Sequence, residues 1–342
     1  MTTQTEQTAA SNPEKTNVAR RIAPAVCLFF LAPLIAEYLL GDLPIKLLIA
    51  LVFLAPLYGG GALLIRESVR RAGRGWPTII LLGLAYAIVE EAFTTQSLFN
   101  PDYLKLKMHL LDPAYIPALG IGGWWTMLML NLHAAWSIAT PIVLIEAAFP
   151  QRANKPWLGR TGYFVTALIF VAGATAATVT QIKRDPFMAS HLQLATSALL
   201  VLILIAAAFL LPRRGPRGTG WVPGPWLAGF VALACGSAMR IPPRWGWGAA
   251  GAMLVVDLML VGAVLLWSGR TAWDERHKLA LGAGAALAYA WYSFIQVPVV
   301  GGATTSARIG NVIFAAGAVW LIWFAARRTS AALRQVNATT AP

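Results

Sequence analysis

Long apolar segments alternate with short polar ones along almost the whole chain. A helix needs about 20 apolar residues to cross a bilayer, and most of these segments reach that length. We count ten of them: residues 22–40, 45–65, 78–99, 121–146, 161–180, 190–211, 225–240, 248–268, 279–298 and 309–326. The seventh is short and flanked by Gly and Pro. The pattern predicts an all-α polytopic transmembrane helix bundle of about ten spans.

Composition supports a protein that lies almost entirely in the membrane. Hydrophobic residues make up 58% of the chain and charged residues only 12%, against about 25% charged in a typical soluble domain. We expect a disordered cytoplasmic N-terminus over 1–20, a single transmembrane domain over 21–328 and a cytoplasmic tail over 329–342. The lipid bilayer is the partner that this composition implies.

The positive charge follows the predicted topology. The net charge of +13 is in the range seen for nucleic-acid-binding proteins. With a cytoplasmic N-terminus, however, the inner segments hold 19 of the 27 Lys and Arg residues and the outer segments hold 8. This asymmetry is what the positive-inside rule predicts. It favours cytoplasmic termini and a multi-pass protein of the cell (inner) membrane, with no nucleic-acid partner.

Two adjacent acids interrupt the third apolar segment. Glu90 and Glu91 lie well inside residues 78–99. One ionised carboxylate near the middle of a span costs roughly 2.5–3.5 kcal/mol on insertion scales. Two adjacent carboxylates also repel each other, so a metal, a cation, a shared proton or water must compensate them. We take Glu90 and Glu91 as the centre of the candidate site.

The fourth segment supplies a partner for these acids. His133 and Ser137 lie one helical turn apart, Asn131 lies nearby, and Thr94 follows Glu90 by one turn in the third segment. At 1.5 Å per residue, Glu90 and His133 each lie about 18 Å from opposite ends of antiparallel spans. They therefore reach similar depths in a ~30 Å hydrocarbon core. The sequence predicts a Glu–His contact between the two helices.

Two further acids need partners. Asp257 lies in the middle of the eighth segment, which contains no cation, and Arg240 at the end of the seventh is the partner that we consider. Glu146 ends the fourth segment, where we expect it to meet arginines of the loops.

The order of these residues resembles the CPBP family of intramembrane metalloproteases, which includes the CAAX prenyl endopeptidases. That family is similar in carrying EExxxR, FxxxH and HxxxN/D motifs on separate spans. Glu90-Glu91-Ala-Phe-Thr-Thr95 resembles the first motif, Met129-Leu-Asn-Leu-His133 the second and His191-Leu-Gln-Leu-Ala195 the third. Thr95, Met129 and Ala195 depart from these motifs. The resemblance implies zinc held by His133 and His191, catalytic Glu90 and Glu91, and hydrolysis of a peptide near the membrane surface, or else an inactive relative of such a protease.

Two other interpretations stay open. Ten spans divide into five plus five, which gives the halves inverted topology and makes the third and eighth segments correspond. A proton- or ion-coupled secondary transporter of a small molecule would then use Glu90, Glu91 and Asp257 around a midplane site. The third interpretation is a non-catalytic membrane protein in which the polar residues form a structural cluster.

Overall fold

The computed structural model describes residues 18–105, 107–212 and 218–340. Its long helices are α1 (Val18–Pro33), α2 (Ala50–Arg71), α3 (Trp76–Ile88), α4 (Gly123–Asn131), α5 (Thr140–Ala148), α6 (Arg160–Arg184), α7 (His191–Leu210), α8 (Pro225–Ala238), α9 (Trp247–Trp267), α10 (Glu275–Tyr292) and α11 (Thr305–Thr340). Three π-helical segments extend them: η1 (Leu34–Leu39) follows α1, η3 (Val89–Thr94) follows α3, and η5 (Leu132–Ala139) joins α4 to α5.

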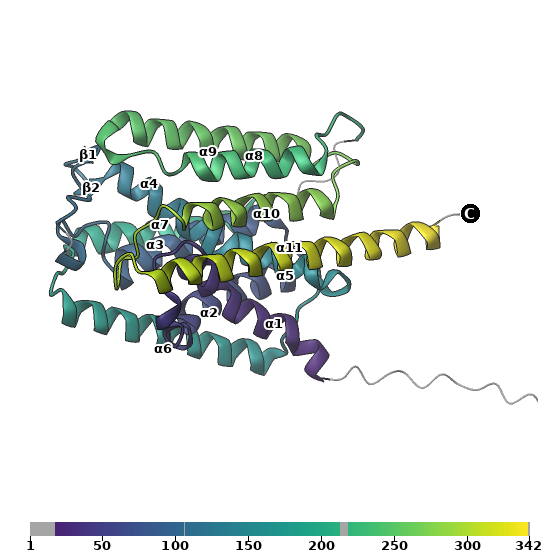
Figure 1. The fold of residues 1–342 in the computed structure, drawn as a ribbon, viewed down its shortest axis with the longest axis horizontal. Helices are drawn as coiled ribbons and strands as arrows, with labels where there is room; N and C mark the ends of the chain where they lie inside the picture. Colours follow the sequence, from purple (N-terminus) through teal and green to yellow (C-terminus); the bar gives the residue numbers. More distant parts are fainter. Residues whose placement is uncertain (1–17, 106, 213–217, 341–342) are drawn as a thin grey trace, which may run out of the picture.

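The connections are short and mostly irregular. They contain the 3₁₀ turns η2 (Ile45–Leu47), η4 (Tyr103–Lys105), η6 (Pro150–Arg152) and η7 (Pro243–Trp245), and the strands β1 (Tyr115–Ile116) and β2 (Ile121–Gly122). The strands form one small antiparallel pair. It lies at one end of the bundle, in the connection between η3 and α4 (Figure 1).

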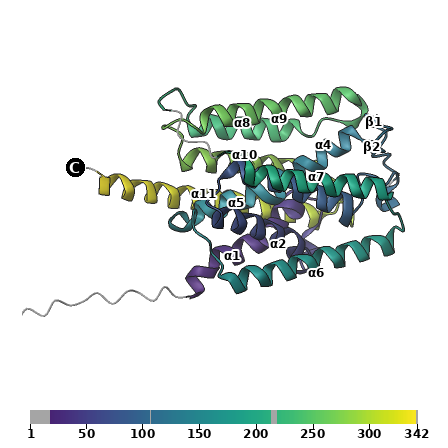
Figure 2. The ribbon, with the colours of Figure 1, turned by 180° about the vertical axis from the view of Figure 1, so that it is seen from behind.

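The bundle is that of a multi-pass membrane protein. Eight of the described helices are long and apolar enough to cross a bilayer. Of the ten predicted segments, the seventh forms only the 14-residue α8, and the ninth forms α10, whose first turn carries Glu275, Arg276 and Lys278. Ten crossings therefore remain a prediction. The start of α1 and the end of α11 lie at the same end of the bundle, as an even number of crossings requires (Figures 1 and 2).

Several predicted boundaries differ from the helices. Helix α2 begins at Ala50 rather than at 45, because Pro44 and the 3₁₀ turn that follows it precede the helix. Helix α11 continues through the predicted tail to Thr340. The prediction of a disordered N-terminus falls mostly on residues 1–17, and Arg213, Arg214 and Arg217 of the predicted inner loop fall in 213–217. Both of these stretches lie outside the described residues, as does the end of the tail at 341–342.

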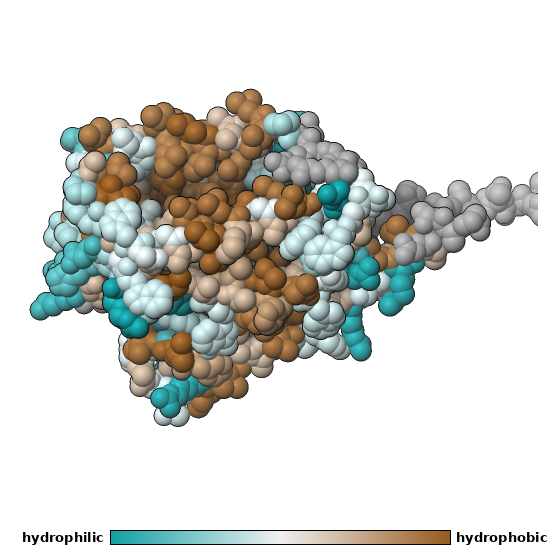
Figure 3. Space-filling model, turned by 90° about the horizontal axis from the view of Figure 1, so that it is seen from above, coloured by the Kyte–Doolittle hydropathy of each residue, from teal (hydrophilic) through white to brown (hydrophobic). Residues whose placement is uncertain are grey.

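Apolar side chains cover the middle of the molecule and polar ones gather at its two ends (Figure 3). Helices α6 and α7 show this most clearly, since only 6% of the apolar window of each is buried inside the protein. Phe164, Leu192 and Leu202 are among their exposed residues. A lipid environment removes the penalty that water would impose on such a surface.

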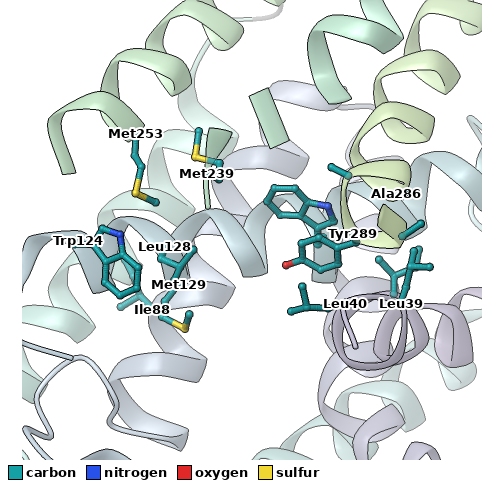
Figure 4. Packing of buried hydrophobic residues seen from close by; sticks show 14 of the residues in the cluster. Leu39, Leu40, Ile88, Trp124, Leu128, Met129, Met239, Met253, Ala286 and Tyr289 are labelled. Atoms are coloured by element: carbon teal, nitrogen blue, oxygen red, sulfur yellow. The ribbon is translucent and has the colours of Figure 1, made fainter. Parts of the chain in front are cut away.

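The interior holds one large apolar cluster that joins most of the bundle. Trp124, Leu128 and Met129 of α4 pack in it with Met253 of α9, while Tyr289 of α10 lies near the end of η1 (Figure 4). Trp136 of η5 stacks on Tyr289 with 4.5 Å between ring centroids. This packing fixes η5 against α10.

Small residues let α8 and α10 approach closely. A Cβ added at Gly284 of α10 would meet the carbonyl oxygen of Gly229 and come within 2.8 Å of the Leu233 amide nitrogen in α8. Close backbone approach of this kind is the usual role of small residues between membrane helices.

We therefore expect Gly284→Ala to destabilise the protein by about 1–3 kcal/mol, because the added methyl group forces α8 and α10 apart. Unfolding in detergent, followed by circular dichroism, measures the loss. Gly262→Ala in α9 is the matched control, since nothing lies within 4 Å of its added Cβ. Its stability should be unchanged or higher, because alanine is the better helix former. Equal losses in both variants would contradict this account of the α8–α10 contact.

A buried ion network fastens the end of α2. The Arg66 guanidinium is fully buried; its Nε donates to Glu146 Oε1 at 3.0 Å and its Nη1 to Glu67 Oε1 at 2.6 Å. Arg70 donates to both oxygens of Glu146, and the Trp157 ring lies 3.5 Å from the Arg66 Cζ. The expectation that Glu146 meets arginines is confirmed, although both come from α2 itself.

Candidate functional site

Three π-helical segments carry the ionisable residues of the site. Glu37 lies in η1, Glu90 and Glu91 lie in η3, and His133 lies in η5. A π-helical turn inserts an extra residue into an α-helix, and such turns are frequent at functional sites. Pro141 lacks the N–H that would bond to the Ser137 carbonyl, which contributes to the irregularity of η5.

His133 lies between the two adjacent glutamates. Its Nε2 is 2.7 Å from Glu91 Oε1, and its Nδ1 is 3.1 Å from both Glu90 Oε2 and Ser137 Oγ. The exposed fractions of Glu90, Glu91 and His133 are 2%, 4% and 2%. The predicted Glu–His contact is confirmed, and both acids make it. The backbone explains why, since the Thr95 amide bonds to the Glu90 carbonyl five residues earlier and the turn is wider than in an α-helix.

Glu91 is the better satisfied of the two acids. Its Oε2 accepts hydrogen bonds from Ser97 Oγ and from Thr95 Oγ1, the latter at 2.9 Å. Trp125 Nε1 donates in turn to Ser97 Oγ at 3.0 Å. Hydrogen bonds to a carboxylate favour its charged form. Glu91 is therefore built to carry a negative charge beside His133.

Glu90 has fewer partners. Its Oε2 meets His133 Nδ1 at 3.1 Å as an ion pair but makes no well-aligned hydrogen bond among the described residues, and neither does the buried hydroxyl of Tyr86 one turn before it. The ring of Tyr86 and the ring of Tyr58 from α2 flank the imidazole, each with its centroid 6.1 Å from that of His133. A buried polar atom without a partner costs about 1–3 kcal/mol. Glu90 is thus the weakly satisfied side of the cluster.

A third carboxylate joins the cluster from η1. The Tyr58 hydroxyl donates to Glu37 Oε1 at 2.6 Å. In the sequence, Glu37 lies near the end of the first apolar segment, residues 22–40. The structure keeps it half-buried and ties it to the cluster through Tyr58. We refer to Glu37, Tyr58, Tyr86, Glu90, Glu91 and His133 as the His133 cluster.

Two predicted site residues lie outside this arrangement. His191 is exposed at the first position of α7, because Ser190 caps that helix and holds its first turn at the surface. Thr94 is buried, but its hydroxyl bonds to the Val89 carbonyl of its own helix at 3.5 Å. The helical pattern placed Thr94 beside Glu90, whereas the hydroxyls that bond to the acids are those of Thr95 and Ser97, which reach Glu91.

Asp257 belongs to a separate contact. Asn131 Nδ2 donates to Asp257 Oδ2 at 2.9 Å, so the partner of Asp257 is an amide from α4 and not Arg240. Arg240 instead lies over the Tyr292 ring, with 4.4 Å from its Cζ to the ring centroid. The described contacts of Asp257 include neither Glu90 nor Glu91. The midplane pair of the transporter interpretation is therefore not assembled in this structure.

Arg240 also attracts Asp42, an acid in the connection after η1. Asp42 accepts a hydrogen bond from Gln296 Nε2 at 2.6 Å. Burial raises the pKa of Asp42 to about 6, and the opposing attraction of Arg240 is too weak to prevent this. Because the folded state binds the Asp42 proton more tightly than the unfolded chain, the proton stabilises the fold.

The free energy of unfolding should therefore fall as pH rises from about 4, the ordinary pKa of aspartate, to about 6. Chemical denaturation at several pH values across this window measures the slope. Asp42→Asn should flatten the part of the slope that comes from this residue. An unchanged slope in that variant would assign the pH dependence to other groups.

The described residues do not fit the zinc site that the CPBP resemblance implies. A catalytic zinc needs three protein ligands and one open position. Both ring nitrogens of His133 face glutamate or serine oxygens, and His191 stays at the surface. In the described part of the chain, no three His, Cys, Asp or Glu side chains are placed to hold one metal ion. We therefore assign no metal to His133.

Sequence reasoning missed the role of Glu37 and of the Tyr58 hydroxyl that bonds to it. Both carry signals that are visible afterwards, since each is a polar side chain in a predicted span. Their partners depend on the π-helical turns, which the α-helical spacing does not predict.

A family model matches residues 26–340 of the chain, from within α1 to the end of α11. The chain belongs to an uncharacterized membrane protein family. This membership agrees with the apolar helical bundle and does not support the CPBP family specifically. No curated protein and no solved structure matches the chain.

Proposed function

We propose that this integral membrane protein binds and exchanges protons at the His133 cluster, as a proton-coupled carrier does. One observation carries the proposal, which is the imidazole held between two buried carboxylates. Imidazole is the side chain whose ordinary pKa lies nearest neutral pH. Ionisable groups inside a membrane mark proton and ion pathways by default.

The charge balance of the cluster favours a variable number of protons. With His133 protonated and Glu90, Glu91 and Glu37 ionised, the cluster carries a net charge of −2. Such a net charge is costly in a medium of low dielectric constant, and each further proton makes it less negative. Glu91 is fixed by Ser97 and Thr95, so Glu90, whose Oε2 has the ion pair with His133 but no well-aligned hydrogen bond, is the group that we expect to change protonation.

Of the carrier and the metalloprotease, the carrier needs fewer groups that the His133 cluster lacks. It needs only groups that bind protons, and it uses Glu90 and Glu91 without Asp257. The metalloprotease would need a third ligand to join His133. Near-stoichiometric zinc in the purified protein, lost in His133→Ala, would favour the metalloprotease after all.

Infrared difference spectroscopy across a pH change tests the proposal, because it detects the C=O stretch of a protonated buried carboxyl. We expect the wild-type protein in lipid nanodiscs to show such a band that Glu90→Gln removes. Asp257→Asn is the matched control, since it removes a carboxylate from another span and should leave the band assigned to Glu90 intact. A spectrum without any band sensitive to Glu90→Gln would refute proton exchange at this residue.

A further inference from the structure

Glu37 is the most exposed carboxylate of the His133 cluster. It is half-buried, whereas Glu90 and Glu91 are almost fully covered. Two residues after it η1 ends, and the chain turns at Gly41, which has a φ of +88°. The amides of Asp42 and Leu43 in this turn both donate to the Glu37 carbonyl. Of the three acids, Glu37 is therefore the one that water reaches most readily.

Tyr58 connects Glu37 with the buried acids. Its hydroxyl donates to Glu37 Oε1, its ring lies beside the His133 ring, and it also faces the Glu90 carboxyl. A phenolic oxygen both donates and accepts, so it can pass one proton on as it takes another. Tyr58 is itself buried, with an exposed fraction of 6%.

Glu90, the buried acid that Tyr58 faces, is suited to receive a proton. Glu90 Oε2 has the ion pair with His133 Nδ1 at 3.1 Å but no well-aligned hydrogen bond, and the buried Tyr86 hydroxyl also faces the Glu90 carboxyl. A proton on Glu90 would give that carboxyl a donor and so relieve part of the cost of burying it.

Resting on the proposed function, we infer that Glu37 is the access group through which protons reach the His133 cluster and that Tyr58 relays them. In one transfer, Glu37 takes a proton from water and gives it to the Tyr58 oxygen. The Tyr58 hydroxyl, which donates to Glu37 in this structure, turns to Glu90 and releases its own proton there as it takes the one from Glu37. One O–H bond thus forms for each that breaks, and Tyr58 ends unchanged. The titratable groups that face this route are Glu37, Tyr38, Asp42, Tyr58, Tyr86, Glu90, Glu91, Tyr103, His133 and Tyr289.

A pH jump on the protein in nanodiscs, read by a soluble pH indicator, tests the route through the rate of proton uptake. Tyr58→Phe should slow uptake on the order of 10²-fold, the scale of a single acid–base group, and leave the number of protons taken up unchanged. Glu37→Gln should slow it similarly and remove at most the proton of Glu37 itself. Asp257→Asn should keep the wild-type rate.

The outcomes separate this inference from the proposed function. Uptake at the wild-type rate in both Tyr58→Phe and Glu37→Gln, with the Glu90-dependent uptake intact, would overturn the route and leave the cluster as a proton site. Wild-type protein with no uptake that depends on Glu90 would overturn the proposed function as well. Tyr58→Phe removes only one oxygen, so it keeps the test available if Glu37→Gln does not fold.

Discussion

Replacing Arg66 with alanine is expected to cost the folded protein about 3–5 kcal/mol, the usual loss when one partner of a buried ion pair is removed. Arg66 is fully buried and bonds to Glu67 and Glu146, and its Nη2 also donates to the carbonyls of Arg152 and Ala153. Without the guanidinium, both glutamates lose a partner inside the protein. Denaturation in detergent measures the loss, read as a shift of the unfolding midpoint.

Two variants show whether the loss comes from this network. Arg244→Ala removes an exposed arginine and should change stability by no more than about 0.5 kcal/mol. Arg66→Lys keeps the charge but cannot reproduce the planar fork that reaches both glutamates, so it should retain only part of the stability. If Arg66→Ala unfolds at the same midpoint as Arg244→Ala, the network does not stabilise the end of α2.

The sequence predicts the helical bundle and the Glu90–His133 contact because both depend only on the length and order of long apolar segments. Apolar segments of about bilayer length are visible in any window, and eight of the described helices are long and apolar enough to cross a bilayer. The Glu90–His133 contact follows from equal depths on consecutive helices, which depend only on the rise per residue. Small errors at the helix ends do not disturb either conclusion.

The remaining part of the site depends on local departures from α-helical geometry. Adjacent acids in an α-helix point in directions about 100° apart, so α-helical spacing assigns Glu90 and Glu91 to different stripes. The π-helical turn of η3 brings both to His133. The partner of Asp257 was missed for another reason, because charge complementarity favours Arg240 whereas the helix packing provides the amide of Asn131.

The His133→Ala variant should show the second large effect. Removing the imidazole leaves Glu90 and Glu91 buried side by side without the group that lies between them, and a buried charge without its partner costs about 3–5 kcal/mol. The free energy of unfolding in detergent, compared with that of the wild type, measures the loss. His191→Ala is the matched control, and it should change stability by no more than about 0.5 kcal/mol because His191 is exposed.

A double-mutant comparison separates charge from packing in this loss. In a Glu90→Gln, Glu91→Gln background, His133→Ala removes the same ring atoms but leaves no buried carboxylate unpaired. The additional loss should then shrink to the cost of a cavity and of lost hydrogen bonds, because amides do not repel each other as carboxylates do. A coupling of the opposite sign or near zero would mean that His133 stabilises the bundle through packing alone. The large coupling that we expect would instead show that the imidazole compensates the charge of the two glutamates, which is the property that a proton-binding site in a membrane requires.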